Sequence, residues 1–331
     1  MNRNVPELSL KSRCNALLSL ESTRALSRNV LIAMPIILGI TGNIQKDGLW
    51  APVDALIKEL RSIHNKFVLH PALSAGLLER GFTVFPSDTA PSISSFFEQS
   101  ELIISFGGDG TLLNTVNELG SRPTPVLGVN HGRLGFLAQI EGSDLEARVG
   151  QLKSGDFLVD ERVVLEASLV SEEPLAAKYA LNEFAIQRSG DTGLLAFEVK
   201  VDGQHLNTYW ADGLLVSTPT GSTAYSLALG GPIMAPGCGS ILIVPIAPHT
   251  LTVRPIVIPD SAKIEIRLIN GLKAHVFTTD GVSHPNALSN GAVVIRKAKH
   301  KVKLVRFSDQ DYFSTLRTKL MWGVHRSKVE D

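Results

Sequence analysis

The chain has 331 residues, of which 44% are hydrophobic and 19% are charged. That apolar share is enough to build buried cores in a chain of this length, and it excludes a mainly disordered protein. Thirty-two basic residues balance 32 acidic ones, so no overall field draws the chain to nucleic acid or to a membrane surface, and an anionic ligand has to be met by a local site.

Cysteine content and hydropathy point to an aqueous, reducing compartment. Cys14 and Cys238 are the only cysteines, which argues against a disulfide framework. The longest apolar stretch, 30–40, contains a proline and is far below the roughly 18 residues that a spanning helix needs. We therefore expect a cytoplasmic protein without a membrane partner.

Residues 1–33 differ from the rest of the chain because Arg, Lys and Ser are frequent and acids are rare. Such a bias can indicate a targeting peptide. We interpret these residues instead as an N-terminal extension outside the core, because the first clear strand begins only after Met34.

Between residues 34 and 157, short apolar runs alternate with segments of helical periodicity. The apolar runs, which predict strands, are 36–40, 82–85, 102–106 and 125–129. The helical stripes are Val53, Leu56, Ile57, Leu60 and Ile63; Leu73, Leu77 and Leu78; and Leu112, Leu113, Val116 and Leu119. This alternation predicts an α/β domain whose parallel sheet is covered by helices.

The periodicity changes to two over 158–305, which predicts a second, mostly antiparallel domain. The alternation is clearest at 197–201, 264–268 and 302–305, and Asp-Gly and Asn-Gly pairs supply hairpin signals. Residues 306–331 return to helical spacing at Phe313, Leu316 and Leu320. Because this helix is too short to be stable alone, we expect the C-terminal segment to return to the α/β domain.

The first motif with chemical meaning is the pentad Gly107-Gly108-Asp109-Gly110-Thr111, between an apolar run and a helical stripe. Glycines at the carboxyl edge of a sheet let backbone N–H groups approach phosphate oxygens, and the following helix N-terminus attracts anions. Asp109 is unusual there, because a carboxylate repels phosphate unless it binds a metal or accepts a proton from an attacking hydroxyl. The alternative is an ordinary strand-to-helix turn capped by an aspartate.

Two more segments carry polar groups suited to a neutral ligand. Residues 212–232 are dense in hydroxyls, small residues and glycines, which can surround a sugar or an amide without a charge. Asn182 and Glu183 precede the apolar run 184–186, and an adjacent amide and carboxylate can bracket a ribose diol or a carboxamide. The alternatives are a polar loop with a short helix and a solvated strand end.

In this order and at these separations, GGDGT, the Asn-Glu pair and DGLLVSTPTGSTAYSLALGGPI resemble the NAD kinase family. Further similar segments are VNHGRLGFL at 129–137, PHTL at 248–251 followed by Arg254-Pro255, Asp280-Gly281, and LRTKLMWG at 316–323. The resemblance covers about residues 35–325. GGDGT alone is shared with lipid kinases, whereas the GSTAY segment is much more specific.

The resemblance implies an N-terminal Rossmann-like parallel α/β domain that binds nucleotide and a C-terminal, mainly antiparallel β-sandwich domain that binds NAD. It implies an enzyme that transfers a phosphoryl group from ATP, or polyphosphate in some members, to the 2′-hydroxyl of the adenosine ribose of NAD, giving NADP. Mg²⁺ or another divalent cation is the implied cofactor, with no protein ligand assigned. A homodimer or homotetramer is the implied assembly.

The resemblance also implies roles for single residues. Asp109 matches the proposed proton acceptor, and Gly110 lies beside the dinucleotide. Asn182 and Glu183 match a pair that contacts NAD. Further matches to NAD contacts are Asp212, Thr223, Ala224, Tyr225, Ser226, Leu227 and Ala228, with Gly193 and Ala247 as weaker candidates. The implied phosphate loop adds Gly107, Gly108 and Thr111.

Two positions depart from the family pattern. Trp210 stands where many members have a basic residue, and Val282 follows Asp280-Gly281 where many have a polar one. A lipid or sphingoid kinase and an inactive NAD-binding sensor remain as alternatives. A zinc enzyme is a poor fit, because the nine histidines show no paired ligand spacing.

Overall fold

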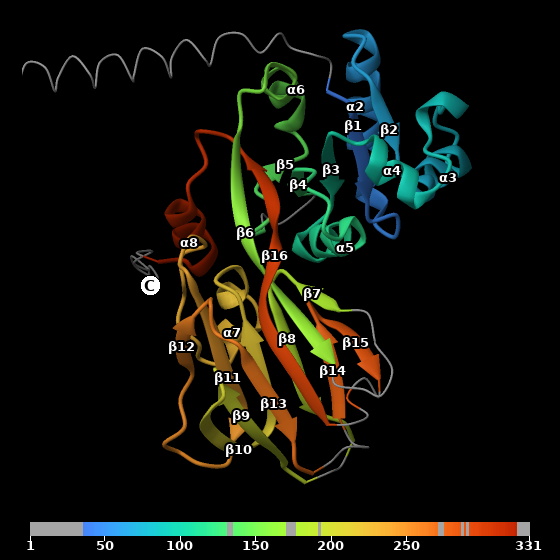
Figure 1. The fold of residues 1–331 in the computed structure, drawn as a ribbon. Helices are drawn as coiled ribbons and strands as arrows, with labels where there is room; N and C mark the ends of the chain where they lie inside the picture. Colours follow the sequence, from blue (N-terminus) through green and yellow to red (C-terminus); the bar gives the residue numbers. More distant parts are fainter. Residues whose placement is uncertain are drawn as a thin grey trace, which may run out of the picture.

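The computed structural model describes residues 36–130, 135–169, 177–190, 193–270, 275–285, 288 and 291–322. The expected extension 1–33, with Cys14, lies outside these residues. Figure 1 shows two bodies, an α/β domain and a β domain, joined by two long strands.

The α/β domain is built on a parallel sheet with the strand order β2-β1-β3-β4. Its strands are β1 (Leu38–Gly42), β2 (Phe67–Leu69), β3 (Leu102–Phe106), β4 (Val126–Asn130) and the short β5 (Ile140–Glu141) beside β4. Its helices are α2 (Trp50–Ser62), α3 (Pro71–Glu79), α4 (Ile93–Gln99), α5 (Asp109–Leu119) and α6 (Leu145–Ser154), with 3₁₀ turns η1 (Asp47–Leu49) and η2 (Pro86–Asp88).

Alternate residues of the parallel strands face opposite helical layers, as the two-residue period of a strand requires. Ile104 of β3 packs in one core with Leu60 of α2 and Val149 of α6. Its neighbour Ile103 packs in a second core with residues of α4 and α5, including Leu112. The expected α/β layering is therefore present.

One predicted strand is wrong. Residues 82–85 form no strand, and the strand beside β1 is instead β2. Phe82 packs only partly against the core, and Phe85 is half exposed immediately before Pro86. The apolar residues of this run therefore belong to a surface loop.

The β domain pairs its strands antiparallel. They are β6 (Leu158–Leu169), β7 (Lys178–Ala180), β8 (Glu183–Arg188), β9 (Leu195–Val201), β10 (Gln204–Ser217), β11 (Ser240–Pro248), β12 (Ile256–Pro259), β13 (Ile264–Leu268), β14 (His275–Thr279), β15 (Val282–Pro285) and β16 (Ala292–Arg306). The turn η3 (Thr220–Thr223) and the short α7 (Tyr225–Ala228) follow β10, and α8 (Tyr312–Leu320) follows β16.

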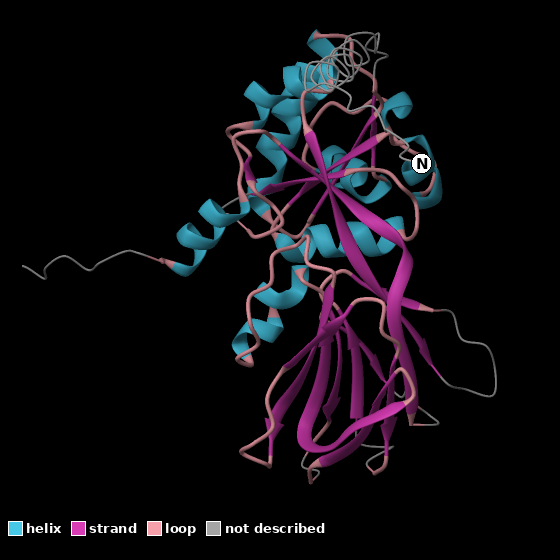
Figure 2. Ribbon diagram, turned by 60° about the vertical axis from the view of Figure 1, so that its left-hand side comes forward, coloured by secondary structure: helices cyan, strands magenta, loops and turns pink. Residues whose placement is uncertain are grey.

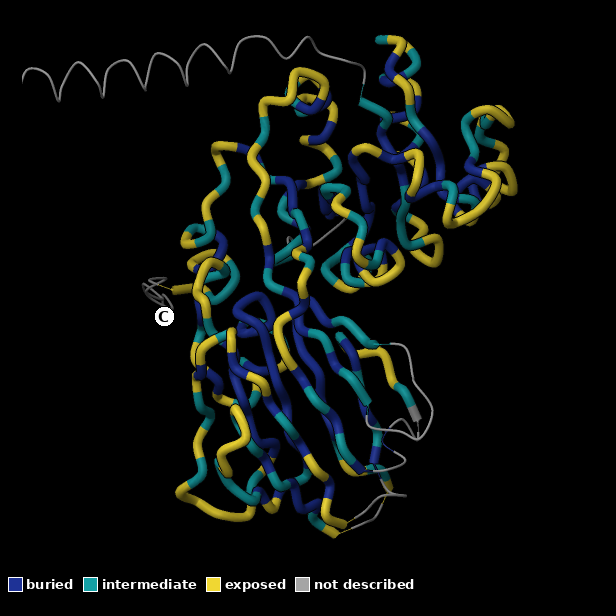
Figure 3. Tube along the Cα trace, viewed as in Figure 1, coloured by how far each residue is buried: buried dark blue, intermediate teal, exposed yellow. Residues whose placement is uncertain are grey.

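β10 changes partners along its length: its first half pairs with β9, and its second half lies between β8 and β11. The strands thereby form two layers around a shared core. Phe197 and Ile266 from one layer pack with Phe184, Val216 and Phe277 from the other. Figure 3 shows the central strands of this domain largely buried, with exposed residues at the hairpin turns and along the outer strands.

β6 and β16 run through both bodies, as Figure 2 shows from a second direction. Val293 and Ile295 of β16 lie in the core of the β domain, whereas Val305 and the following Phe307 lie in a core of the α/β domain. Leu304 pairs with Val126 of β4, so all strands belong to one continuous sheet. Among the described residues, no helix combines the length and hydropathy needed to cross a lipid bilayer.

Candidate active site

The GGDGT pentad forms a tight turn at the carboxyl edge of the parallel sheet. β3 ends at Phe106 and α5 begins at Asp109. Gly107 has a φ of 151°, and a Cβ there would overlap the side chain of Thr111. Only glycine fits at position 107. The turn that this glycine allows leads directly into the N-terminus of α5.

The Asp109 carboxylate is held by main-chain donors. It accepts hydrogen bonds from the N–H groups of Phe136 at 2.8 Å, Leu137 at 3.0 Å and Ala138 at 3.0 Å. A Cβ at Gly135 would overlap the same carboxylate. A carboxylate offers about four acceptor positions, so three N–H bonds orient this one and leave room for one more donor.

A pocket of about 640 Å³ opens beside this turn. Its walls are the end of β1 with the following loop 43–46, one face of α5, and the turn from β14 into β15 at 280–282. Gly108 and Thr111 of the expected phosphate loop line it, as does Gly110, whereas Gly107 does not. Glycine N–H groups, hydroxyls, amides and Lys46 thus surround a space at a helix N-terminus, which suits a phosphate-bearing ligand.

His70 lies in the wall of this pocket as the N-cap of α3. Its Nδ1 accepts the N–H of Ala72 at 3.2 Å, so Nε2 carries the proton. The Nε2 atom is buried without a hydrogen-bond acceptor among the described residues and lies 3.8 Å from Glu118 Oε2 on α5. Burial lowers the pKa of His70 and raises the pKa of Glu118, so His70 is a neutral donor.

Asp280 connects the pocket to the Asn-Glu pair. Its carboxylate accepts the N–H groups of Leu181 at 2.8 Å, Asn182 at 2.8 Å and Glu183 at 2.9 Å. Asp280 and Gly281 have φ values of 47° and 82° and form the two-residue turn between β14 and β15. Asp280 therefore lies in the pocket wall while its carboxylate binds the backbone at the start of β8.

Glu183 is buried, and its Oε2 has no hydrogen-bond partner among the described residues. Burial, followed by the negative charge of Asp280, raises the pKa of Glu183 to about 8. Burial also raises the pKa of Asp280, against three N–H bonds that lower it. Because only Asp280 receives such donors, we assign the proton to Glu183, which is then a neutral acid at pH 7.

The hydroxyl-rich turn after β10 packs on the same pair. Thr218 Oγ1 donates to Leu181 O at 2.6 Å, and Ser217 Oγ donates to Asn182 O at 3.2 Å. A Cβ at Gly221 would overlap Asn182 O. These hydroxyls hold the turn against β8, so fewer of them face a ligand than the sequence suggests.

Two of the other predicted NAD contacts, Asp212 and Tyr225, reach the far end of β8 and β10. Asp212 forms an ion pair with Arg188 at 2.8 Å, and Gln187 Nε2 donates to Tyr225 Oη at 2.9 Å. Three more residues of the predicted set follow Tyr225 in α7, namely Ser226, Leu227 and Ala228. The predicted residues thus fall into two groups, one at each end of the β8–β10 pair.

Gly193 and Ala247 belong to this far end as well. Gly193 lies just before β9, and Ala247, near the end of β11, has a φ of 43°. Trp210, beside them on β10, is exposed. No group of three or more His, Cys, Asp or Glu side chains among the described residues is arranged to hold a metal ion.

Residues 72–157 match the ATP-NAD kinase N-terminal domain, and residues 181–307 match the ATP-NAD kinase C-terminal domain. The NAD kinase of Burkholderia thailandensis is 39% identical over 272 residues, which cover 78% of this chain and 91% of that protein. The chain belongs to the NAD kinase family. A second NAD kinase, from Burkholderia orbicola, is 36% identical over 295 residues, or 89% of this chain and 96% of that one.

Two solved structures share the fold. Yeast NADH kinase complexed with NADH has a TM-score of 0.81 at 23% identity, covering 90% of this chain and 91% of its own. An NAD kinase from Archaeoglobus fulgidus in complex with ATP has a TM-score of 0.66 at 23% identity, covering 86% of this chain and 99% of its own. The predicted fold class, a parallel α/β domain followed by an antiparallel β domain, is confirmed.

Within this NAD kinase fold, sequence reasoning missed three polar residues of the site. The Asp280-Gly281 pair predicts a hairpin turn but not the contacts of the Asp280 carboxylate. His70 precedes Pro71 after an apolar run, which signals the start of a helix but not a place in the site. Glu118 falls on a helix face whose neighbours only the fold reveals.

Proposed function

We propose that this chain transfers the γ-phosphoryl group of ATP to the 2′-hydroxyl of the adenosine ribose of NAD, giving NADP and ADP. The observation that carries the proposal is the position of Asp280. Asp280 lines the pocket beside the glycine loop, and its carboxylate also holds the backbone of Asn182 and Glu183. A donor pocket and an acceptor-binding pair are thereby parts of one site.

ATP can lie in the pocket along α5, from Gly110 to Glu118. Phosphates suit the end formed by Gly108 and Gly110, where the N-terminus of α5 favours anions. From Gly110 to Glu118 the helix rises by about 12 Å, which leaves the nucleoside beside His70 and Glu118. The Nε2–H of His70 and the oxygens of Glu118 complement a ribose or base rather than another phosphate.

Asp109 would act as the proton acceptor. As the 2′-hydroxyl oxygen forms its bond to the γ-phosphorus, the bond from that phosphorus to the leaving ADP oxygen breaks and the hydroxyl proton passes to Asp109. The three N–H groups from 136–138 keep the carboxylate oriented for this transfer. Glu183, as a neutral acid, can both donate to and accept from a ribose hydroxyl.

A divalent cation, with Mg²⁺ as the expected one, would neutralise phosphate charge. The carboxylates that line the pocket are Glu118 and Asp280, and Mg²⁺ typically uses one or two carboxylates together with substrate phosphates. This donor set fits an ion that arrives with the nucleotide.

NAD would extend from Asn182 and Glu183 along β8 and β10 to Asp212 and Tyr225, with Gly193 and Ala247 nearby. We further propose that the enzyme is a cytoplasmic homodimer or homotetramer. Sedimentation of the active protein as a monomer alone would contradict that assembly.

The decisive experiment compares wild type with Asp109→Asn in an assay of NADP formation from NAD, with ATP or polyphosphate as donor. The variant should fold and bind NAD by calorimetry but lose turnover by roughly 10²-fold or more, the usual scale for removal of a general base. Comparable turnover would refute the role of Asp109. Phosphorylation of diacylglycerol alone would favour a lipid kinase, and NAD binding without product would favour a sensor.

A further inference from the structure

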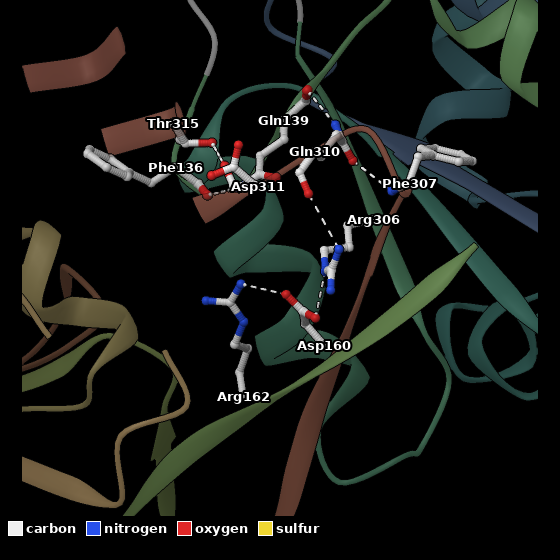
Figure 4. A network of polar contacts seen from close by, with 9 residues as sticks. All are labelled: Phe136, Gln139, Asp160, Arg162, Arg306, Phe307, Gln310, Asp311 and Thr315. Atoms are coloured by element: carbon white, nitrogen blue, oxygen red, sulfur yellow. Dashed lines mark hydrogen bonds and ion pairs between the residues drawn. The ribbon is translucent and has the colours of Figure 1, made fainter. Parts of the chain in front are cut away.

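We infer that Gln310, in the segment between β16 and α8, is a positioning residue that holds Asp109 in its working orientation through the loop 136–139. The inference rests on the proposed function of Asp109. Gln310 lies 201 positions from Asp109 in sequence, and a series of hydrogen bonds connects the two. Figure 4 shows the part of this series that runs from Phe136 through Gln139 to Gln310.

The series starts at the carboxylate. Asp109 accepts the N–H of Phe136 at 2.8 Å. The carbonyl of Phe136 accepts the side-chain amide of Gln139 at 2.9 Å. The carbonyl of Gln139 in turn accepts Nε2 of Gln310 at 2.9 Å. Each bond involves the loop that supplies the donors to Asp109.

Gln310 is anchored at its other end. Its Oε1 accepts the N–H of Phe307 at 2.8 Å, and Phe307 is fully buried in the core. Its backbone carbonyl accepts Arg306 Nη1 at 3.4 Å, and Arg306 Nε donates to Asp160 of β6 at 2.8 Å. Gln310 therefore connects the loop 136–139 by hydrogen bonds to the end of β16 and, through Arg306, to β6.

The loop needs this support because its function depends on main-chain geometry. Three successive N–H groups meet one carboxylate only if the backbone at 136–138 is fixed. Within the loop itself, a backbone hydrogen bond joins Gly135 N–H to Ala138 O at 3.0 Å. Without the amide of Gln310, the carbonyl of Gln139 loses this donor, and with it the loop loses the hydrogen bond that connects it to the segment after β16.

A purely structural role can be separated from positioning by Gln310→Glu. Glutamate keeps an oxygen that accepts the N–H of Phe307 but presents a second oxygen, in place of Nε2, to the carbonyl of Gln139. If Gln310 only terminates β16, this variant behaves as wild type. If Gln310 acts through the loop, the variant loses activity as Gln310→Ala does.

The matched control is Tyr312→Phe. It removes a hydrogen bond from Tyr312 Oη to Met234 O at 3.1 Å, two residues further along, without touching the series to Asp109. We expect both Gln310 variants to lower kcat roughly tenfold with KM for NAD and ATP nearly unchanged, since small misplacement of a catalytic group costs turnover rather than binding. Tyr312→Phe should retain wild-type kcat.

A double-mutant cycle tests the route to Asp109. In an Asp109→Asn background, Gln310→Glu should have no further effect on the residual rate. A wild-type kcat in Gln310→Glu, or the same fold-loss in both backgrounds, would overturn the inference.

Hydrogen exchange gives a readout that is independent of activity. Peptides covering 136–138 should exchange faster in Gln310→Glu than in wild type or Tyr312→Phe. If the wild type forms no NADP, the proposed function fails, and exchange alone decides whether Gln310 holds the loop: faster exchange supports this, and unchanged exchange overturns it.

Discussion

The donors that orient the Asp109 carboxylate are backbone N–H groups. Backbone N–H groups cannot rotate away, so the carboxylate is held in one orientation as long as the loop 136–138 keeps its shape. The same arrangement makes the site sensitive to any group that separates loop and carboxylate.

Gly135→Ala should therefore impair catalysis. The added methyl group would overlap Asp109, so either the carboxylate or the loop must move, and we expect kcat to fall roughly tenfold or more, because a displacement of about 1 Å can cost 10²-fold. Steady-state kinetics and thermal unfolding measure the effect.

Gly142→Ala is the matched control, because a Cβ there would make only ordinary contacts with Pro52, at 3.6 Å or more. Equal kinetics for the two variants would contradict the close approach at Gly135.

The Glu183 carboxyl predicts a pH dependence of stability. Its pKa is about 8 in the folded protein and about 4.3 when unfolded. Between these values the folded state retains a proton that the unfolded state has released, so the free energy of unfolding falls as the pH rises through this window. Glu183→Gln removes this part of the dependence, and urea unfolding at pH 5, 7 and 9 should show the variant gaining on wild type.

Glu265→Gln is the control for the loss of a carboxylate. Lys263 lowers the pKa of this partly exposed residue, so Glu265 stays ionised from pH 5 to 9 and its replacement should not change how stability depends on pH in that range. Stability curves of wild type and Glu183→Gln that stay parallel from pH 5 to 9 would show that Glu183 is ionised.

At the scale of single residues, sequence reasoning selected Asp109, Asn182 and Glu183, because each belongs to a motif with its own chemistry. It did not select Asp280, His70 or Gln310. The contacts of Asp280 span 97 to 99 positions and that of Gln310 with Gln139 spans 171, and no local pattern encodes pairs so far apart.

His70 is the N-cap of helix α3 and also lines the pocket in which we propose that ATP binds. His70→Asn keeps a good N-cap but is too short to present a donor to the pocket. The lost hydrogen bond, worth about 1 kcal/mol, should raise KM for ATP about fivefold with KM for NAD unchanged. Kinetics with varied ATP measure this.

Ser92→Asn is the control, since it exchanges one N-cap for another on α4. An unchanged KM for ATP in His70→Asn would exclude His70 from the donor site.

At the scale of elements, periodicity predicted α2, because the stripe Val53, Leu56, Ile57 and Leu60 is its buried face, but it did not predict α4 or α6. Strands were predicted less well. β2 has only three residues, and the run 82–85 alternates without a partner strand. Strand formation depends on a free neighbouring edge, which composition does not reveal.

The molecule as a whole should unfold in one step. β6 and β16 contribute residues to cores of both bodies, and the sheet has no break between them. Calorimetry should give a single transition with equal calorimetric and van't Hoff enthalpies. Two resolved transitions would show that the α/β and β bodies are energetically independent.

The change of periodicity near residue 157 predicted the two bodies but not their connection. β6 reads as an ordinary strand of the second body, yet Asp160 forms an ion pair with Arg306 beside the α/β domain. The segment after β16 likewise contacts both bodies, through Gln310 to Gln139 and Tyr312 to Met234.

The pairing of β8 with β10 also sets the distance between the two groups of proposed NAD contacts. Glu183 lies opposite Ser217 and Gln187 lies opposite Gly213, so the two groups of proposed NAD contacts are separated by four strand steps, or about 13 Å. A dinucleotide can reach both groups, whereas a mononucleotide reaches one. Under the proposed function, each half of NAD would be recognised weakly by itself, and two different half-ligands could occupy the strand at once without competing.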